Sequence, residues 1–428
     1  MPSNRTTRAG LTVAPIVLVA GTVAGGYWLR HHQHRRLGAP TAPMYWFGQT
    51  RLNWWALLAA VVLGAAVLVS PWVLRLERRW FLGAAVAMAL VTRVALNMSR
   101  FGPHELIFPL VGHEGRHEYL RTVGLFLDNP IGYLRHFPEL VRTVLPIHPS
   151  GHPPGPTVLL GGLYEVGLRG AWGETVAILL VGSLTAIPVY LLGGELADEP
   201  SSRLAVLAWL FAPNVLLMSA TSMDAVFASV SSVAAVLLLR RRAVVGGLAT
   251  AVASFLSYAL LAVPVWAVAT LLLRGARPRA LLPKVCVALA VIAGCYLLLW
   301  LLTGYQPYDA YQATNHAYRI GVSNRRPLWF WFFGDIAVFL LGLGLPGLVL
   351  WSRALGQSDS AAVALAGTLV LASASGFAKA EVERIWLFLI PLAAVSIGPQ
   401  LLGRRLRPLL TLLVAQALLV ELFYGTTW

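Results

Sequence analysis

The sequence predicts an all-α fold, a polytopic transmembrane bundle of about 11–13 helices that each cross a bilayer with roughly 20 apolar residues. Hydrophobic residues make up 57% of the 428 residues and charged residues only 12%, whereas soluble proteins carry about 25% charged residues. Apolar runs of spanning length recur along the whole chain. No window alternates polar and apolar residues as the strands of a membrane barrel do.

The net charge of +15 is concentrated in short clusters between the apolar runs. These clusters are RLERR at 75–79, RRR at 240–242, RGARPRALLPK at 274–284 and RRLR at 404–407. Short basic loops of this kind are typical of the cytoplasmic side of a membrane protein, whereas a nucleic-acid-binding protein gathers its basic residues on one face. We therefore expect a multi-pass protein of the plasma membrane that binds membrane lipids and no nucleic acid.

The candidate spans were assigned in chain order from their length and hydrophobicity. They lie at about 11–29, 54–74, 80–98, 174–195, 203–220, 223–239, 284–302, 328–351, 361–377, 385–402 and 408–424. The first run follows Arg5 and Arg8 and is long for a signal peptide, which predicts a signal anchor. We expect an N-terminal part at 1–53, a main transmembrane module at 54–402, and a basic loop with a last helix at 403–428.

The stretch 243–273 is too long for one ordinary helix, and both of its flanks are basic. If both flanks are cytoplasmic, the chain enters the membrane and returns, so we divide the stretch at Ser257–Tyr258 into two short helices. This division places the polar segments 99–154, 303–327 and 377–384 on the extracytoplasmic side, together with SATSMD before the 223–239 span.

Two segments test this topology. The topology requires that the thirteen residues 156–168 do not cross, and a helix of that length fits the membrane interface. The cluster RHHQHRR at 30–36 becomes extracytoplasmic, against the charge rule. Either the first run does not cross, or the rule is overridden there.

The long polar segment 99–154 is rich in histidine and glutamate. Within it, Glu114, Glu118 and Arg121 follow a spacing of i, i+4 and i+7, which would put two carboxylates and a guanidinium on one helix face. Such a helix could present Glu114 or Glu118 to a pocket. The alternative is an interfacial helix whose charges face water.

The motif HPSGHPPGP at 148–156 carries two histidines among four prolines. Proline fixes its own backbone and biases the preceding residue toward extended conformations, so His148 and His152 are expected on a stiff loop beside the membrane. Such a loop suits a polar headgroup or a phosphate, and the alternative is a turn that starts the next helix. A zinc site at these histidines is only weakly indicated.

Charged residues also mark the outer starts of two spans. Asp224 lies at a helix N-terminus, where capping is the competing interpretation. The segment KAEVERIW begins at 379 and contains Glu381, Glu383 and Arg384, which suit phosphate binding or a surface ion-pair cluster. The loop 303–327 adds tyrosines, arginines and His316, a combination that suits a sugar ring and a lipid-linked phosphate.

These motifs together resemble the GT-C class of integral-membrane glycosyltransferases, in particular its actinobacterial members. The resemblance covers most of 80–402 and rests on HEGRHEYL, HPSGHPPGPTVLL, SMDAVFASVSSVAAVLLLRRR, the following short-helix pair, and KAEVERIWLFLIPL. It implies a polyprenyl-phosphate sugar donor, an outward-facing site and a carboxylate in the first large outer loop. The expected activity is hexosyl or pentosyl transfer, for example of mannose, to a glycan, lipid or protein acceptor of the cell envelope.

The resemblance also assigns roles to residues. It makes Glu118 or Glu114 the catalytic carboxylate, with Glu105 a distant third. The expected substrate-binding residues are His117, His148, His152, Asp224, Tyr258, His316, Glu381, Glu383 and Arg384. Many members carry paired acidic residues in the first outer loop, whereas this chain spreads single glutamates among histidines. That departure leaves open which glutamate is the base and whether a divalent metal is needed.

Two other functional classes compete with an enzyme. A transporter or flippase of a lipid-linked or polar solute would bury charges in mid-membrane and show symmetric halves. Arg93 is the only clear mid-span charge, and no internal repeat is evident, which favours an enzyme. A non-catalytic envelope scaffold would leave the outer histidines without a shared cavity. An enzyme requires Glu114 or Glu118, the two histidines of 148–156, Asp224 and Arg384 to line one outward-opening cavity.

Overall fold

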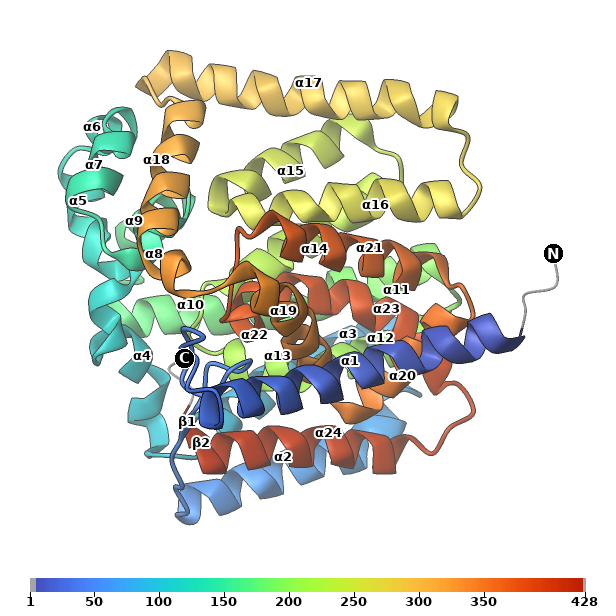
Figure 1. Ribbon diagram of the computed structural model, residues 1–428. Helices are drawn as coiled ribbons and strands as arrows, with labels where there is room; N and C mark the ends of the chain where they lie inside the picture. The colour runs from blue at the N-terminus through green and yellow to red at the C-terminus, as the bar shows by residue number, and fades with distance from the viewer. Residues whose placement is uncertain (1–4, 426–428) are drawn as a thin grey trace.

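The computed structural model describes residues 5–425 and is 79% helical. Its one described strand pair joins β1 (Phe47–Gly48) to β2 (Tyr424–Gly425) in antiparallel register. The predicted all-α class is therefore confirmed. In Figure 1 the long helices lie side by side along one common direction, as in a membrane bundle.

Six helical segments are long and apolar enough to cross a membrane. They are α1 (Arg5–His31), α2 (Trp54–Val73), α3 (Arg78–Asn97), the pair α10 (Gly170–Leu184) with α11 (Ala186–Leu196), α17 (Pro278–Thr303) and α24 (Leu406–Phe423). A seventh candidate is the pair α19 (Leu328–Gly342) and α20 (Leu345–Gly356). The structure thus supports a membrane protein, whereas the larger number of spans stays a prediction.

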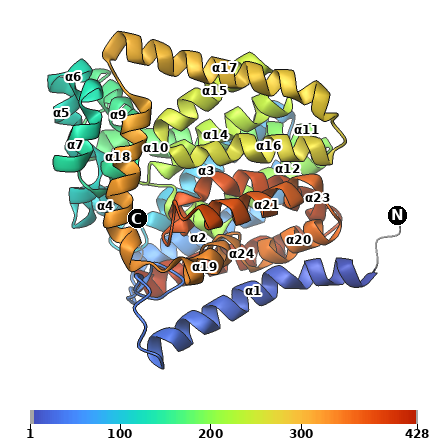
Figure 2. The same ribbon diagram turned by 45° about the horizontal axis from the view of Figure 1, so that its top comes forward.

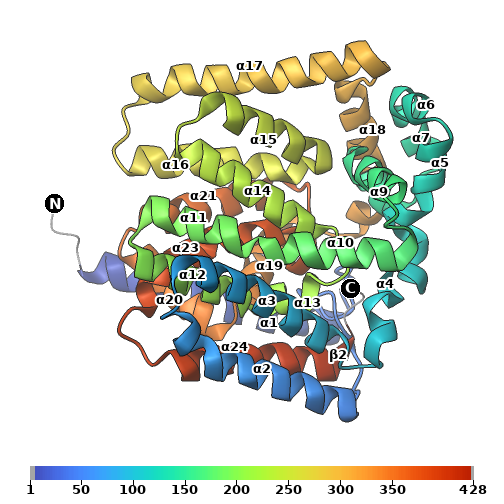
Figure 3. The same cartoon turned by 180° about the vertical axis from the view of Figure 1, so that it is seen from behind.

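The remaining apolar helices are shorter and form the middle of the bundle. They are α12 (Glu199–Leu210), α13 (Pro213–Met218), α14 (Asp224–Leu239), α15 (Ala243–Leu256), η4 (Tyr258–Leu261), α16 (Ala262–Leu273), α21 (Ser360–Ser375), η6 (Leu387–Leu389) and α23 (Ile390–Leu401). α12, α14 and α23 supply much of the main hydrophobic core, which includes the buried Trp209 and Phe211. Figure 3 shows α11 and α12 beside α14 and α23 from behind.

Breaks between helices show which of the predicted spans are continuous helices. The predicted division of 243–273 is confirmed, because the extended Ser257 ends α15 and η4 begins at Tyr258. The prediction of one continuous helix at 203–220 is wrong, and the predicted span at 328–351 is divided into two helices that together remain a candidate span. Pro213 follows the break between α12 and α13, while α19 and α20 meet at 110° across a break that contains Gly344 with a φ of 78°.

The two ends of the bundle differ in charge. At the basic end, Arg240 pairs with Glu195 at 2.7 Å, Arg274 donates to the carbonyl of Glu195, and Arg203 donates to the carbonyl of Leu74. These contacts gather the basic loops that follow α2, α14 and α16, which are predicted to share one side, around the end of α11 and the start of α12. The opposite, polar end contains residues 99–154, 219–223, 303–327 and 376–381 (Figure 1).

Helix α1 lies on the outside of the bundle, where it packs against α19 and α20 (Figure 2). Residues 30–36 lie at the polar end of the bundle. They directly precede Leu37, whose carbonyl accepts a hydrogen bond from Trp331 at the start of α19. The structure therefore agrees with the predicted sidedness of this cluster relative to the other polar loops. The side of the membrane on which the polar end lies stays a prediction.

The polar segment 99–154 folds into a chain of short helices that leads into α9. These are η1 (Gly102–Leu106), α4 (Phe108–Val111), η2 (Glu114–His117), η3 (Tyr119–Thr122), α5 (Val123–Asp128), α6 (Pro130–Arg135), α7 (Phe137–Thr143), α8 (Ile147–Gly151) and α9 (Gly155–Glu165). α9 has eleven residues, so the predicted short helix after the prolines is confirmed. The other polar-end helices are α18 (Pro307–Ile320), η5 (Val322–Arg325) and α22 (Val382–Ile385).

The predicted continuous helix from Glu114 to Arg121 is wrong. Two 3-10 turns replace it, and Glu118 between them is extended, with φ −85° and ψ 162°. Gly115 packs so closely on the carbonyl of Leu110 that no side chain would fit there. This packing folds the segment back on α4, so Glu118 is buried while Glu114 stays half-buried and Arg121 exposed.

Candidate functional site

The centre of the polar end is a buried ion pair between α14 and α22. Arg384 Nη1 donates to Asp224 Oδ2 at 2.7 Å, and Ser222 Oγ donates to the same oxygen at 2.6 Å. Both charged residues are buried. The capping interpretation of Asp224 is wrong, because Met223 is the N-cap and Asp224 binds the guanidinium instead.

Glu381 extends this pair into a chain of alternating charges. Its Oε2 lies 3.5 Å from Arg384 Nη2, and its Oε1 accepts a hydrogen bond from Arg326. Arg326 is 5% exposed and comes from the end of the 303–327 loop. The interpretation of 379–384 as a surface cluster is therefore wrong, because Glu383 and Arg384 are buried and Glu381 and Arg384 pair inside the protein.

The backbone before α22 is strained. Ala380 and Glu381 have φ values of 65° and 60°, which cost of order 1–3 kcal/mol for a residue with a side chain. Two hydrogen bonds hold this conformation: Ala380 N donates to Asp335 Oδ1 at 2.9 Å, and Lys379 N donates to the hydroxyl of Tyr318 at 2.8 Å. Strain that the surroundings maintain at a polar site is typical of functional segments.

Glu118 and the two histidines of the proline motif lie beside the ion pair. His148 Nε2 is 3.9 Å from Glu118 Oε1, which is longer than a hydrogen bond. His152 Nδ1 lies 2.9 Å from the hydroxyl of Tyr119 and 3.1 Å from the carbonyl of His148. His148 belongs to the short helix α8, and the extended His152 follows it, so only part of the predicted stiff loop is extended.

Burial controls the charge of this group. The pKa of Glu118 is raised to about 7, mainly by burial; Arg384 opposes the increase and Asp224 contributes to it. Burial also lowers the pKa of His148 well below its usual 6.5, with a further decrease from Arg384. The pKa of His152 is lowered by burial and partly restored by Asp224. Near neutral pH both imidazoles are therefore neutral, while Glu118 is divided between its two protonation states.

Two further predicted residues lie at the edge of this group. Glu114 is half-buried and close enough to add to the raised pKa of Glu118. His117 accepts from Arg116 Nε at 3.0 Å, and its charge would lower the pKa of His148. The buried pair of Glu118 and His148 is thus flanked by a more exposed charged rim.

Three predicted residues point elsewhere. Glu383 Oε1 accepts from Tyr45 N at 2.7 Å, so this carboxylate binds the segment before α2, and burial raises its pKa to about 7. Tyr258 packs its ring against Tyr311, with centroids 5.5 Å apart. His316 is exposed on α18. No described contact joins Tyr258 or His316 to Glu118 or Arg384 within residues 5–425.

The structure adds buried acids that the sequence analysis missed. Glu174 in α10 is 2% exposed, and neither of its oxygens has a hydrogen-bond partner within residues 5–425. Asp335 in α19 is fully buried. The prediction that Arg93 is the only clear mid-span charge is therefore wrong. An acid inside an apolar run is itself a signal of function, and it applied to Asp335.

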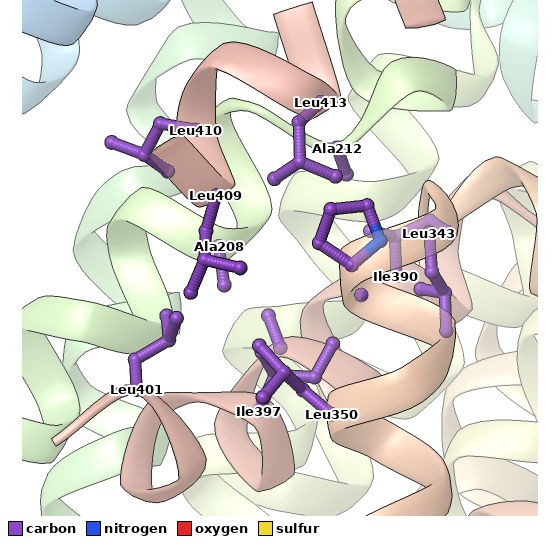
Figure 4. A pocket seen from close by; sticks show the side chains of 13 residues that line it. Ala208, Ala212, Leu343, Leu350, Ile390, Ile397, Leu401, Leu409, Leu410 and Leu413 are labelled. Atoms are coloured by element: carbon purple, nitrogen blue, oxygen red, sulfur yellow. The ribbon is translucent and has the colours of Figure 1, made fainter. Parts of the chain in front are cut away.

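Neither of the two described pockets is lined by Glu118, His148, Asp224 or Arg384. The pocket in Figure 4 lies among α12, α20, α23 and α24, and every labelled side chain in it is apolar. The other pocket involves Glu199 and Arg203 at the basic end. The structure thus brings Glu118, His148, Asp224 and Arg384 together but buries them, so the outward-opening cavity that an enzyme requires stays a prediction.

Among residues 5–425, no three His, Cys, Asp or Glu side chains converge as a metal-binding group. The divalent metal stays an expectation. No protein-family model matches the chain, and neither a curated protein nor a solved structure shows significant similarity to it.

Proposed function

We propose that the protein is a plasma-membrane glycosyltransferase of the GT-C kind that uses a polyprenyl-phosphate sugar at its polar end, on the extracytoplasmic side. The acceptor is a glycan, lipid or protein of the cell envelope. One observation carries the proposal: the buried Glu118 lies beside His148, within the electrostatic influence of the Asp224–Arg384 ion pair. A base next to a held guanidinium is the arrangement that glycosyl transfer from a phosphate requires.

In the proposed reaction Glu118 accepts the proton of the acceptor hydroxyl. The acceptor oxygen forms a bond to the anomeric carbon while the bond from that carbon to the phosphate oxygen breaks, and the electron pair leaves with the lipid phosphate. Attack opposite the leaving group inverts the anomeric carbon. Arg384, which Asp224 and Glu381 hold, stabilises the charge that develops on the phosphate. The neutral His148 and His152 bind sugar hydroxyls.

The protonation state of Glu118 suits this role. A general base works best when its pKa lies near the operating pH, and burial raises the pKa of Glu118 to about 7. Glu118 is 7% exposed and faces His148, whereas Glu114 lies on the half-buried rim. We therefore favour Glu118 over Glu114 as the base.

A transfer assay tests the proposal. Purified protein is incubated with a panel of polyprenyl-phosphate sugars and envelope acceptors, and Glu118→Gln is compared with Glu114→Gln as the matched control. We expect Glu118→Gln to lower turnover by about 10²–10⁴-fold, which is the usual contribution of a general base. Glu114→Gln should change turnover less than about 10-fold. Equal rates for wild type and Glu118→Gln would rule out Glu118 as the base.

A transporter or flippase of a lipid-linked solute is the second candidate. The burial of Asp335 and Glu174 inside apolar helices favours it, because transporters use intramembrane acids to carry protons or bind ions. Proteoliposomes distinguish the two functions. A transporter moves the labelled lipid-linked sugar across the bilayer without forming a glycosylated product, whereas the enzyme forms product in detergent, where no bilayer separates two compartments.

A further inference from the structure

We propose that Arg326 and residues 37–46 form a clamp that positions Arg384, and that Arg326 is therefore a positioning residue of the site. This inference rests on the proposed function, in which Arg384 stabilises the leaving phosphate. It gives the segment between α1 and α2 a role beyond linking an anchor helix to the bundle.

Arg326 joins three segments that are far apart in the sequence. Its Nη1 donates to the carbonyl of Lys379 at 2.6 Å, its Nε donates to the carbonyl of Gly38 at 3.3 Å, and its Nη2 donates to Glu381. Its guanidinium carbon lies 5.5 Å from the ring centroid of Tyr45. The planar guanidinium of Arg326 thus holds residues 37–46, the clamp segment, against the residues that precede Arg384.

The clamp segment has two other attachments. Trp331 Nε1 donates to the carbonyl of Leu37 at 2.8 Å, and Tyr45 N donates to Glu383 at 2.7 Å. Between them the chain passes close to Arg326 at Gly38, whose φ is 76°. A Cβ added to Gly38 would lie 2.7 Å from the carbonyl oxygen of Arg325 and 2.7 Å from Arg326 Cγ. Only glycine permits this approach without strain.

The clamp acts on the strained part of the loop. Arg326 binds the carbonyl of Lys379 and the side chain of Glu381, and these contacts bracket Ala380 and Glu381, the two positions with positive φ. Glu381 in turn contacts Arg384. If the bonds of Arg326 are lost, the strained backbone relaxes toward a commoner conformation, and Arg384 moves relative to Asp224.

Two matched pairs of variants test the clamp. Arg326→Lys replaces the fork with a single ammonium group, and its control is Arg142→Lys at an exposed position of the same end of the molecule. Gly38→Ala pushes the clamp segment away without changing a charge, and its control is Gly48→Ala, where an added Cβ has open space. The second pair keeps the test valid if Arg326→Lys does not fold.

Hydrogen exchange and steady-state kinetics are the two readouts. We expect Arg326→Lys and Gly38→Ala to speed amide exchange at 379–381 by about 10-fold or more, because their native hydrogen bonds open more often. We also expect the KM for the lipid-linked donor to rise and kcat to fall, with a loss of about 10- to 100-fold in kcat/KM. The KM for the acceptor should stay constant. General unfolding would lower the amount of active enzyme, and therefore the maximal rate, without raising either KM. Both controls should behave as wild type.

Unchanged exchange at 379–381 in Arg326→Lys and Gly38→Ala would overturn the clamp. Faster exchange with wild-type donor kinetics in an active enzyme would overturn the positioning of Arg384. If the wild-type protein transfers no sugar, the proposed function fails, whereas the clamp itself still stands or falls on the exchange data.

Discussion

The two ends of the molecule contain ion pairs of the same length in different surroundings. At the polar end, Arg384 lies 2.7 Å from Asp224, and the side chains are 6% and 3% exposed. At the basic end, Arg240 lies 2.7 Å from Glu195, and the side chains are 36% and 29% exposed. Charge and distance are therefore equal, and burial is the difference.

Burial changes what an ion pair does. An exposed pair contributes about 0–1 kcal/mol, because water already stabilises both charges. A buried pair loses hydration that its mutual attraction only partly replaces, so it is a weak source of stability. The basic end therefore uses its arginines to orient loops, whereas the polar end holds charged groups where water is excluded and electrostatic effects on a substrate are strong.

The largest effect that separates the two ends is expected when one partner of each pair is removed. Asp224→Ala leaves Arg384 with fewer carboxylate partners inside the protein, and we expect a loss of about 3–5 kcal/mol in the free energy of unfolding. Glu195→Ala at the basic end should cost less than about 1 kcal/mol. Thermal unfolding of both variants in the same detergent measures the difference. Equal decreases in melting temperature would show that burial does not distinguish the pairs.

A second prediction sharpens the comparison through pH. The deprotonated form of Glu118 is the proposed base, and burial raises its pKa to about 7. We therefore expect kcat/KM to rise between pH 6 and pH 8 with an apparent pKa of about 7. A flat profile over this range would contradict the role of Glu118.

The raised pKa of Glu118 also predicts how the stability of the protein changes with pH. Because the folded pKa exceeds the usual 4.5, the folded state binds more protons than the unfolded state between these values. Wild type should therefore lose stability relative to Glu118→Gln as pH rises from about 4.5 to about 7, and then level off. The lowered pKa of His148 makes the stability rise with pH below 6.5. Because His148 is present in both wild type and Glu118→Gln, this contribution does not distinguish the two proteins. Unfolding curves at several pH values measure the difference.

Hydrophobicity and basic loops were sufficient to predict the helical class, the break at Ser257 and the gathering of the polar segments at one end. The remaining features depend on contacts that the chain pattern does not contain. The i, i+4, i+7 spacing from Glu114 predicted a helix, but the close approach of Gly115 to Leu110 requires a turn. The bend between α19 and α20 likewise depends on local glycine and proline conformations.

The candidate site shows the same limit. Its residue types were visible as motifs, and Glu118, His148, Asp224 and Arg384 do lie together. The partner of Arg384 was not predictable, because Asp224 is 160 residues away. Arg326 was expected only as one of several basic residues in the 303–327 loop, and Asp335 was missed because it lies in an aromatic apolar run. Their roles follow from the positive φ values at 380–381, which only the folded backbone reveals.

The smallest expected effect concerns salt. A double-mutant cycle of Arg240→Gln and Glu195→Gln should give a coupling energy of about 0.2–1 kcal/mol at low salt, because both side chains are partly solvated. At about 1 M salt the screening length falls to roughly 3 Å, so this coupling should disappear. A cycle of Arg384→Gln and Asp224→Asn should keep its coupling at both salt concentrations, since counterions do not reach a pair that is 6% and 3% exposed. The free energies of unfolding of all the variants, measured at the two salt concentrations, give both coupling energies and test this difference. If the Asp224 cycle loses its coupling with salt, water and ions enter the polar end, and the contrast between the two pairs fails.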